Sequence, residues 1–61
     1  MESITWYIIK RPNQTCEVIS HQELMSIPDG DILEKWGSFN TQGEAIAKRV
    51  GLIRAGKCQP L

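Results

Sequence analysis

The sequence is poor in the residue types from which catalytic and metal sites are built. It has one histidine, His21, and two cysteines, Cys16 and Cys58, among 61 residues. A structural zinc site requires four Cys or His ligands, and the chain falls short of that number. A Cys–His pair would bring His21 beside a thiol, but nothing in the spacing favours that contact. We therefore expect no catalytic residues, no metal ligands and no enzymatic activity.

Cofactor-binding motifs are missing as well. The run Asp29-Gly30-Asp31 has the acidic spacing of a calcium loop, but the further oxygen ligands and the glutamate of an EF-hand do not follow. The glycines at positions 37, 43, 51 and 56 form neither a GxGxxG sequence nor a P-loop. The sequence predicts a turn at the two aspartates and no bound cofactor.

Long hydrophobic segments are absent. No run approaches the ~18 apolar residues that span a bilayer, and the first residues lack the regions of a signal peptide. Both observations predict a cytoplasmic protein with no membrane partner. Thiols stay reduced there, so Cys16 and Cys58 are predicted to be structural or incidental thiols rather than a redox pair. A chain this short buries only about 60% of its unfolded surface, which makes self-association the expected supplement to its core.

Net charge is zero, but the two signs are separated along the chain. The charged residues between positions 13 and 34 are all acidic. The segment 41–61 has one carboxylate, Glu44, against four cations, which are Lys48, Arg49, Arg54 and Lys57. The simpler interpretation is that the two halves attract each other within the fold. The basic segment could instead form a patch for an anionic partner.

Three segments have the composition of β-strands, rich in β-branched or aromatic residues: residues 4–10, 16–20 and 32–36. Pro12 and Asn13 predict a hairpin turn between the first two, which would make them antiparallel. Ser20 and Glu23 have the spacing of a capping box, which predicts a short helix over residues 21–25.

The segment that begins at Thr41 is predicted to form an amphipathic helix. Thr41 and Glu44 form a second capping box, in which each side chain can bond the backbone N–H of the other residue. Gly51 could end the helix early, but the apolar periodicity continues past it, so we predict a continuous helix. Gly56 has the position of a C′ glycine. The stripe expected to face the core comprises Ile46, Val50 and Ile53, widened by Ala45 and Leu52.

These elements predict an α+β fold in which residues 1–61 form a single small domain. The three strands would form an antiparallel sheet, in the order β-β-short helix-β-α, packed on one C-terminal helix. One helix covers one face of a sheet. The first strand directs Trp6 and Ile8 to one face and Tyr7 and Ile9 to the other, so both faces are apolar.

The face that the helix leaves open suggests the function. We expect a partner-binding surface on the sheet, drawn from Trp6, Tyr7, Ile9 and Trp36. The leading hypothesis is therefore a small non-enzymatic interaction module, either an adaptor for a protein partner or a homodimer. Open sheet edges offer a second route to a dimer.

Nucleic-acid binding is the alternative function. Phosphate contacts would come from Lys48, Arg49, Arg54 and Lys57, and bases could stack on Trp6, Tyr7 or Trp36. Against it, a sequence pI of about 6.5 lacks the basic excess of a dedicated nucleic-acid binder. Arg49 also lies close to the apolar stripe, where it could be a structural residue with a snorkelling or paired side chain.

Two family resemblances accompany this interpretation. The strand that contains Trp6-Tyr7-Ile8 and the ending EKWGSFNTQGEAIAKRVGLIRAGKCQP, residues 34–60, resemble a family of small cyanobacterial proteins of unknown function. Some members carry the name "DDE transposase family". A transposase core needs three separated carboxylates on a far larger fold, and nothing in this chain matches one.

The second resemblance is looser. Residues 39–45, Phe-Asn-Thr-Gln-Gly-Glu-Ala, are similar to the segment that enters the helix in the small DNA-binding domains of tyrosine integrases. Those domains pair a three-stranded sheet with a helix, so this resemblance implies the same fold class and DNA as a partner.

Overall fold

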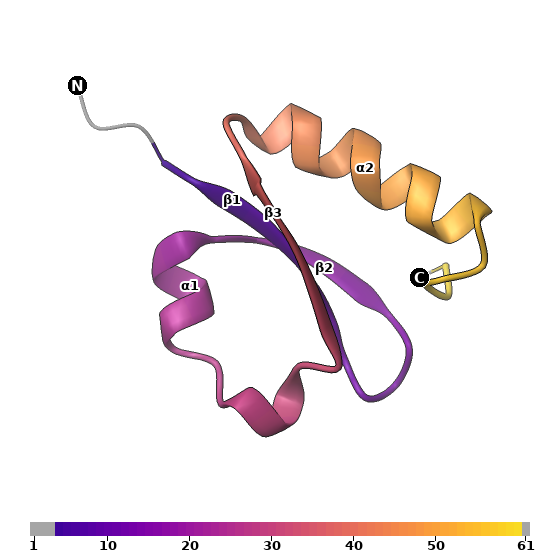
Figure 1. Ribbon diagram of the computed structural model, residues 1–61, viewed down its shortest axis with the longest axis horizontal. Coiled ribbons are helices and arrows are strands. Elements are labelled where there is room, and N and C mark those ends of the chain that lie inside the picture. Colours follow the sequence, from indigo (N-terminus) through magenta and orange to yellow (C-terminus); the bar gives the residue numbers. More distant parts are fainter. Residues whose placement is uncertain (1–3, 61) are drawn as a thin grey trace.

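The computed structural model describes residues 4–60, which form a three-stranded sheet with helical segments on both sides (Figure 1). In chain order the elements are β1 (Trp6–Lys10), β2 (Cys16–Ser20), α1 (His21–Met25), the 3-10 turn η1 (Asp29–Asp31), β3 (Glu34–Phe39) and α2 (Gln42–Arg54). The predicted α+β class, antiparallel sheet and C-terminal helix are confirmed.

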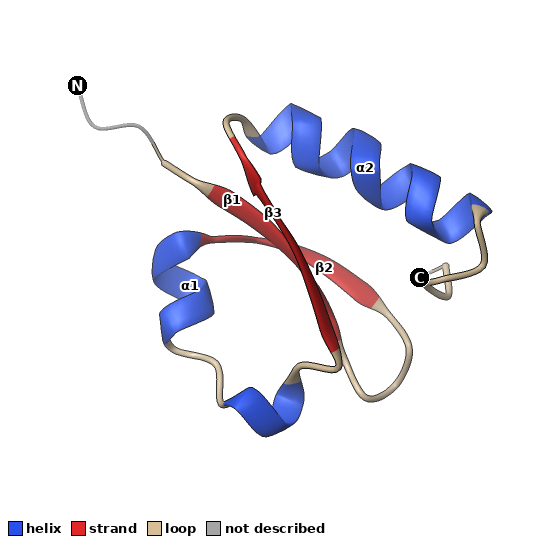
Figure 2. Ribbon diagram, in the orientation of Figure 1, coloured by secondary structure: helices blue, strands red, loops and turns tan. Residues whose placement is uncertain are grey.

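The sheet has β1 at its centre and is antiparallel throughout, in the order β2-β1-β3. Ile8 on β1 lies opposite Val18 on β2 and Trp36 on β3, and this register fixes which side chains share a face. Figure 2 shows the strands running between α2 on one side and α1 with η1 on the other. Both β2 and β3 are therefore edge strands.

The third strand is shifted from its predicted range of 32–36, because it begins at Glu34 rather than at Ile32 and ends at Phe39 rather than at Trp36. The N–H of Ile32 donates to the Asp29 carbonyl at 3.1 Å and closes η1, so this residue belongs to the turn. The N–H of Leu33 then reaches the Lys10 carbonyl at 2.7 Å, which starts the contact with β1. Local hydrogen bonding of the turn thus outweighs the β-propensity of the apolar pair.

Both predicted N-caps are present. The Ser20 hydroxyl accepts the Glu23 N–H at 3.3 Å, and the Thr41 hydroxyl accepts the Glu44 N–H at 3.1 Å. The reciprocal bond of the second box differs from the prediction, because the Glu44 carboxylate accepts from the N–H of Asn40 at 3.3 Å rather than from Thr41. The carboxylate still lies at the positive end of the helix dipole.

The C-terminal end of α2 confirms the predicted C′ glycine. Gly56 has φ +80°, its N–H donates to the Ile53 carbonyl at 3.1 Å, and the Lys57 N–H donates to the Leu52 carbonyl at 2.9 Å. This pair of bonds is a Schellman motif, which favours glycine because of the positive φ. The helix continues through Gly51 as predicted, with no neighbour within 4 Å of the place a Cβ would take.

The face that α2 turns to the sheet is only partly the predicted one, because Ala45, Leu52 and Ile53 pack against the core whereas Ile46 and Val50 do not. Ile46 and Val50 are 46% and 41% exposed, whereas Ala45 and Leu52 are buried. Arg49 lies between these two on the helix surface, and its Nε donates to the Cys16 carbonyl at 2.8 Å. The small Ala45 side chain allows close approach, and the arginine bond fixes the rotation of the helix about its axis. The core on this side comprises Ile8, Cys16, Ala45, Leu52 and Cys58.

The second face of the sheet is covered, which corrects the prediction that it is open. Ile9 is 0% exposed and Ile19 is 5% exposed, although both point away from α2. The chain from α1 through η1 passes over this side (Figure 1), and α1 contacts both β1 and β2. A second long helix is not needed to cover this face, because the segment of short helical turns and loops between β2 and β3 lies over it.

The two cysteines form a disulfide, so the prediction of reduced thiols is wrong. Cys16 at the start of β2 is bonded to Cys58 beyond α2, with 5.7 Å between their Cα atoms. The same tail is held by a second contact, because the Gln59 N–H donates to the Gln14 carbonyl at 2.8 Å. The residues after α2 are thus fastened to the β1–β2 turn.

Candidate interaction site at the edge of the sheet

The predicted sheet-face residues do not form one surface. Trp6 and Trp36 point toward α2 and are partly buried against its core, whereas Tyr7 and Ile9 point to the opposite face. Ile9 is fully buried, so no partner can reach it. Tyr7 is half-buried, and the Lys35 Nζ lies over its ring, 5.6 Å from the centroid.

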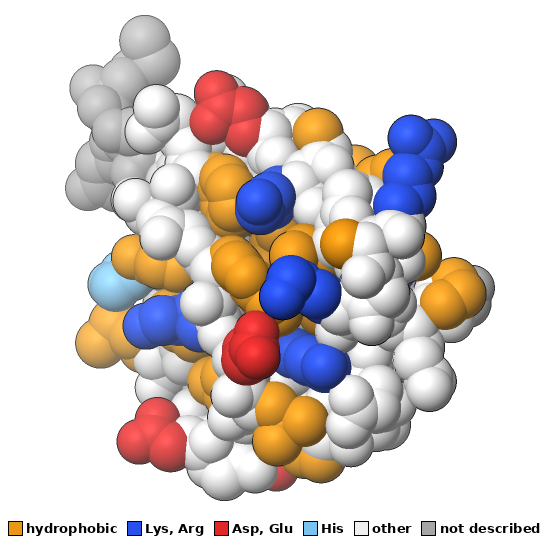
Figure 3. Space-filling model, turned by 45° about the vertical axis from the view of Figure 1, so that its right-hand side comes forward, with side chains coloured by type: hydrophobic (Ala, Val, Ile, Leu, Met, Phe, Trp, Pro, Cys, Tyr) orange, Lys and Arg blue, Asp and Glu red, His pale blue; other side chains and the backbone are white. Residues whose placement is uncertain are grey.

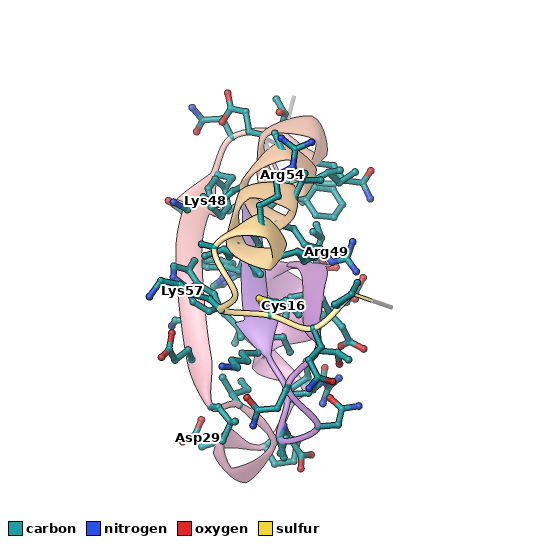
Figure 4. All side chains as sticks on the ribbon, turned by 90° about the vertical axis from the view of Figure 1, so that its right-hand side faces the viewer. Cys16, Asp29, Lys48, Arg49, Arg54 and Lys57 are labelled. Carbon is teal, nitrogen blue, oxygen red and sulfur yellow. A yellow bond between two sulfur atoms is a disulfide. The ribbon has the colours of Figure 1, made fainter. Side chains whose placement is uncertain are left out.

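The predicted basic residues are also dispersed. Figure 4 shows Lys48 of α2 and Lys57 of the chain after it on the side nearer β3, and Arg49 on the side nearer β2. Arg54 is exposed at the last turn of the helix. Arg49 is half-buried and bonded to the backbone of β2, which supports the structural reading of this residue. The four cations therefore belong to at least two surfaces.

The outer edge of β2 has an open backbone at the middle of the strand, whereas at its start the Cys16 carbonyl accepts from Arg49. In an antiparallel pair, the backbone N–H and C=O groups of successive residues point alternately toward and away from the partner strand. The Arg11 N–H donates to the Thr15 carbonyl and the His21 N–H donates to the Thr5 carbonyl, both at 2.8 Å. These two bonds show that the odd-numbered residues of this segment direct their backbone groups toward β1. By this alternation, Val18 at the middle of β2 directs both its N–H and its C=O away from β1.

An open groove of about 470 Å³ lies against this edge, between β2 and α2. Side chains from both faces of β2 line it, as expected of a groove at a sheet edge. The helix contributes Ile46, and the exposed Val50 follows one turn later on the same flank. The lining residues are Cys16, Glu17, Val18, Ile19, Glu23, Gln42, Ile46 and Arg49.

Opposite charges lie toward the two ends of this groove. Arg49 is anchored at the Cys16 end by its Nε, and its two terminal nitrogens make no hydrogen bond to any other residue within 4–60. Glu23 lies at the Ser20 end, where its backbone N–H is bonded to the serine hydroxyl. The remaining carboxylate of the lining, Glu17, is paired with Arg11 at 2.9 Å. Arg49 and Glu23 are thus available to an occupant of the groove.

Neither cysteine can act as a nucleophile in the structure, because each sulfur is bonded to the other. His21 lies beside Tyr7, with 6.0 Å between the ring centroids, and not beside a thiol. No cluster of three His, Cys, Asp or Glu side chains suited to a metal ion occurs within residues 4–60.

Comparison with protein-family models, with curated proteins and with solved structures finds no match to this chain. The resemblances to small cyanobacterial proteins and to integrase domains therefore stay predictions. Neither helix within residues 4–60 combines the length and the apolar composition that crossing a bilayer requires.

The sequence predicts Arg49 as a candidate contact but carries no signal for the groove in which it lies. Val18 and Glu23 are predicted only as parts of a strand and a cap, because the edge that they share depends on the strand order. A sequence signal did exist for Ile46 and Val50. Both lie on one side of Arg49 around the helix, with Ala45 and Leu52 on the other, so a helix rotation that buries Ala45 and Leu52 leaves Ile46 and Val50 outside.

Proposed function

We propose that this protein is a non-enzymatic interaction module that binds an extended polypeptide segment by strand addition to β2. The outward-directed N–H and C=O of Val18, which open onto the groove, are the observation that supports this proposal. Strand addition takes its affinity from such main-chain bonds and its specificity from side-chain contacts on alternate residues. The groove offers both, because the exposed apolar flank of α2 runs beside the free backbone edge.

The second edge of the sheet is the poorer template. The pairing of β1 with β3 has a register irregularity between Trp6 and Tyr7, whereas all five residues of β2 pair regularly with β1. Lys35 is the second residue of β3, and a lysine on an edge strand disfavours further pairing. The proposed site is therefore the β2 edge and not β3.

Substituting Val18→Pro is expected to abolish peptide binding while the fold is retained. The substitution removes an N–H that points away from β1, and proline is tolerated at such an edge position. The probe is an array of degenerate ten-residue peptides, screened with the oxidised protein at about 1 µM. We expect wild-type protein to select peptides with alternating apolar residues, and the variant to bind them at least tenfold more weakly.

The matched control is Lys35→Pro, which removes the corresponding outward N–H on β3. It should leave peptide selection unchanged, and circular dichroism should show that both variants keep their secondary structure. Peptide binding that survives Val18→Pro, or that is lost equally in Lys35→Pro, contradicts strand addition at β2.

Nucleic-acid binding remains the second candidate, favoured by the placement of Lys48 of α2 and Lys57 of the following chain on the same side of the molecule (Figure 4). Trp36 and Phe39 of β3 are half-buried against the core under that helix. Figure 3 shows Lys and Arg side chains spread over one face of the molecule with apolar side chains between them. Acidic side chains interrupt this face, which makes it the weaker candidate.

Lys48→Glu should weaken binding to a random 20-nucleotide single strand several-fold if this face contacts phosphates. Each phosphate contact contributes to a linear fall of log affinity with log salt concentration. Fluorescence anisotropy at about 20 mM and 150 mM salt measures both quantities. Lys35→Glu, on the opposite sheet face, makes the same charge change and is the control. Equal effects of the two variants, or no binding at the lower salt, contradict this candidate.

The disulfide removes one of the observations on which the predicted cytoplasmic location depends. The prediction assumed reduced thiols, whereas disulfides persist in oxidising compartments. The disulfide between Cys16 and Cys58 instead favours a compartment in which thiols are oxidised. Trapping free thiols with iodoacetamide in intact cells of the native source distinguishes the two locations.

A further inference from the structure

We infer that the strand added to β2 is β2 of a second copy of this chain, paired antiparallel about Val18. This inference rests on the proposed function, because it uses the same edge and specifies the occupant. A two-fold interface requires that one surface be complementary to itself. The β2 edge meets that requirement in its backbone, its charges and its apolar contacts.

The backbone is self-complementary about one residue. Val18 directs both its N–H and its C=O away from β1, by the alternation that the flanking bonds set. In a two-fold pair centred on Val18, that residue faces its own copy and the two exchange both hydrogen bonds. The ladder is limited to this central pair, because the Cys16 carbonyl already accepts from the Arg49 Nε and Ser20 is the N-cap of α1.

The charges are self-complementary about the same point. Arg49 is anchored at Cys16 and Glu23 at Ser20, which are the two ends of β2. These ends lie about 14 Å apart along a strand, too far for the pair to meet within one chain. Antiparallel pairing brings the Arg49 end of one copy against the Glu23 end of the other, twice per dimer. Parallel pairing would instead place like charges together.

The apolar flank of α2 completes the surface. Ile46 and Val50 are exposed on the side of α2 next to the groove, and Val18 is half-buried beneath it. Two-fold pairing brings this flank of each copy against the other across the joined strands. The same contact would bury the apolar side chains that a single copy leaves in water, which small domains often achieve by oligomerisation.

The test is sedimentation equilibrium of the oxidised full chain between about 1 and 500 µM. Wild-type protein should show a concentration-dependent monomer–dimer equilibrium. Glu23→Lys and Arg49→Glu each place like charges at both ends of the joined strands, and each should weaken its own dimer about tenfold or more. Val18→Pro, which removes both central bonds, should weaken it at least a hundredfold.

Mixing the two charge variants tests the antiparallel pairing directly. A Glu23→Lys chain paired with an Arg49→Glu chain has opposite charges at both ends, so the mixture should form a heterodimer about as tight as the wild-type dimer. This recovery depends on two-fold antiparallel pairing and on folded chains, and it therefore separates a weakened interface from misfolding. Circular dichroism of each variant provides the check on folding.

A wild-type chain that stays monomeric at 500 µM overturns the inference. If Val18-dependent peptide binding persists in that case, the proposed function stands and only the occupant is wrong. If peptide binding is also absent, both fail. A dimer that Val18→Pro leaves intact, or charge variants that do not recover on mixing, shows that the copies meet through another surface and overturns the inference as well.

Discussion

Reduction of the Cys16–Cys58 disulfide is expected to lower the free energy of unfolding by about 4 kcal/mol. The bond closes a loop with a sequence separation of 42, and closing a loop of that length removes roughly this much conformational entropy from the unfolded chain. Domains of about 60 residues are marginally stable, so this bond contributes a large part of the free energy of unfolding. Urea unfolding with and without a phosphine reductant measures the difference.

The matched control is the double variant Cys16→Ala with Cys58→Ala, which should respond to urea identically with and without the reductant. In the wild-type chain the thermal midpoint should fall by roughly 15–30 °C, because 1 kcal/mol corresponds to about 4–8 °C in a domain of this size. A wild-type midpoint that the reductant leaves unchanged contradicts a stabilising role for the bond.

Substituting Ile9→Ala is expected to cost about 3 kcal/mol of stability. Ile9 is 0% exposed on the sheet face that α1 and η1 cover, and deleting a fully buried isoleucine costs roughly 2–5 kcal/mol. The same substitution on an open face would cost far less, so the effect tests whether this face is covered in solution. Urea unfolding of the oxidised chain gives the value.

Ile46→Ala is the control, because the same atoms are removed from a side chain that is 46% exposed on α2. Its cost should stay within about 0.5 kcal/mol, since less surface leaves water and alanine is the better helix former. If the two substitutions cost the same, the assignment of Ile9 to the covered face and Ile46 to the free flank is wrong.

Most helices and strands of this fold can be predicted from interactions between residues that are close in sequence. The caps at Ser20 and Thr41 and the C′ position of Gly56 depend on residues three or four apart, and all are observed. The β3 boundary failed because two apolar residues had a competing local use in η1. Where local hydrogen bonds and residue propensities favour the same structure, the sequence pattern predicts it correctly.

The candidate site cannot be predicted from such short-range patterns. Arg49 and Cys16 are 33 residues apart, and the bond between them rotates α2 so that Ile46 and Val50 face outward. Periodicity alone could not choose between a stripe centred on those two residues and one centred on Ala45 and Leu52, because both repeat at helical spacing. The choice was made by a contact between distant elements.

By itself, then, the sequence determined the fold class, the helix limits and the absence of zinc-ligand or nucleotide motifs. Tertiary structure decided three things that rest on long-range contacts. It joined Cys16 to Cys58, it laid the segment after β2 over Ile9, and it made β2 an edge strand with an outward Val18. Local hydrogen bonds and propensities act over a few residues and can be read along the chain. Strand order, coverage and disulfide pairing depend on which distant segments meet, and only the folded chain shows that.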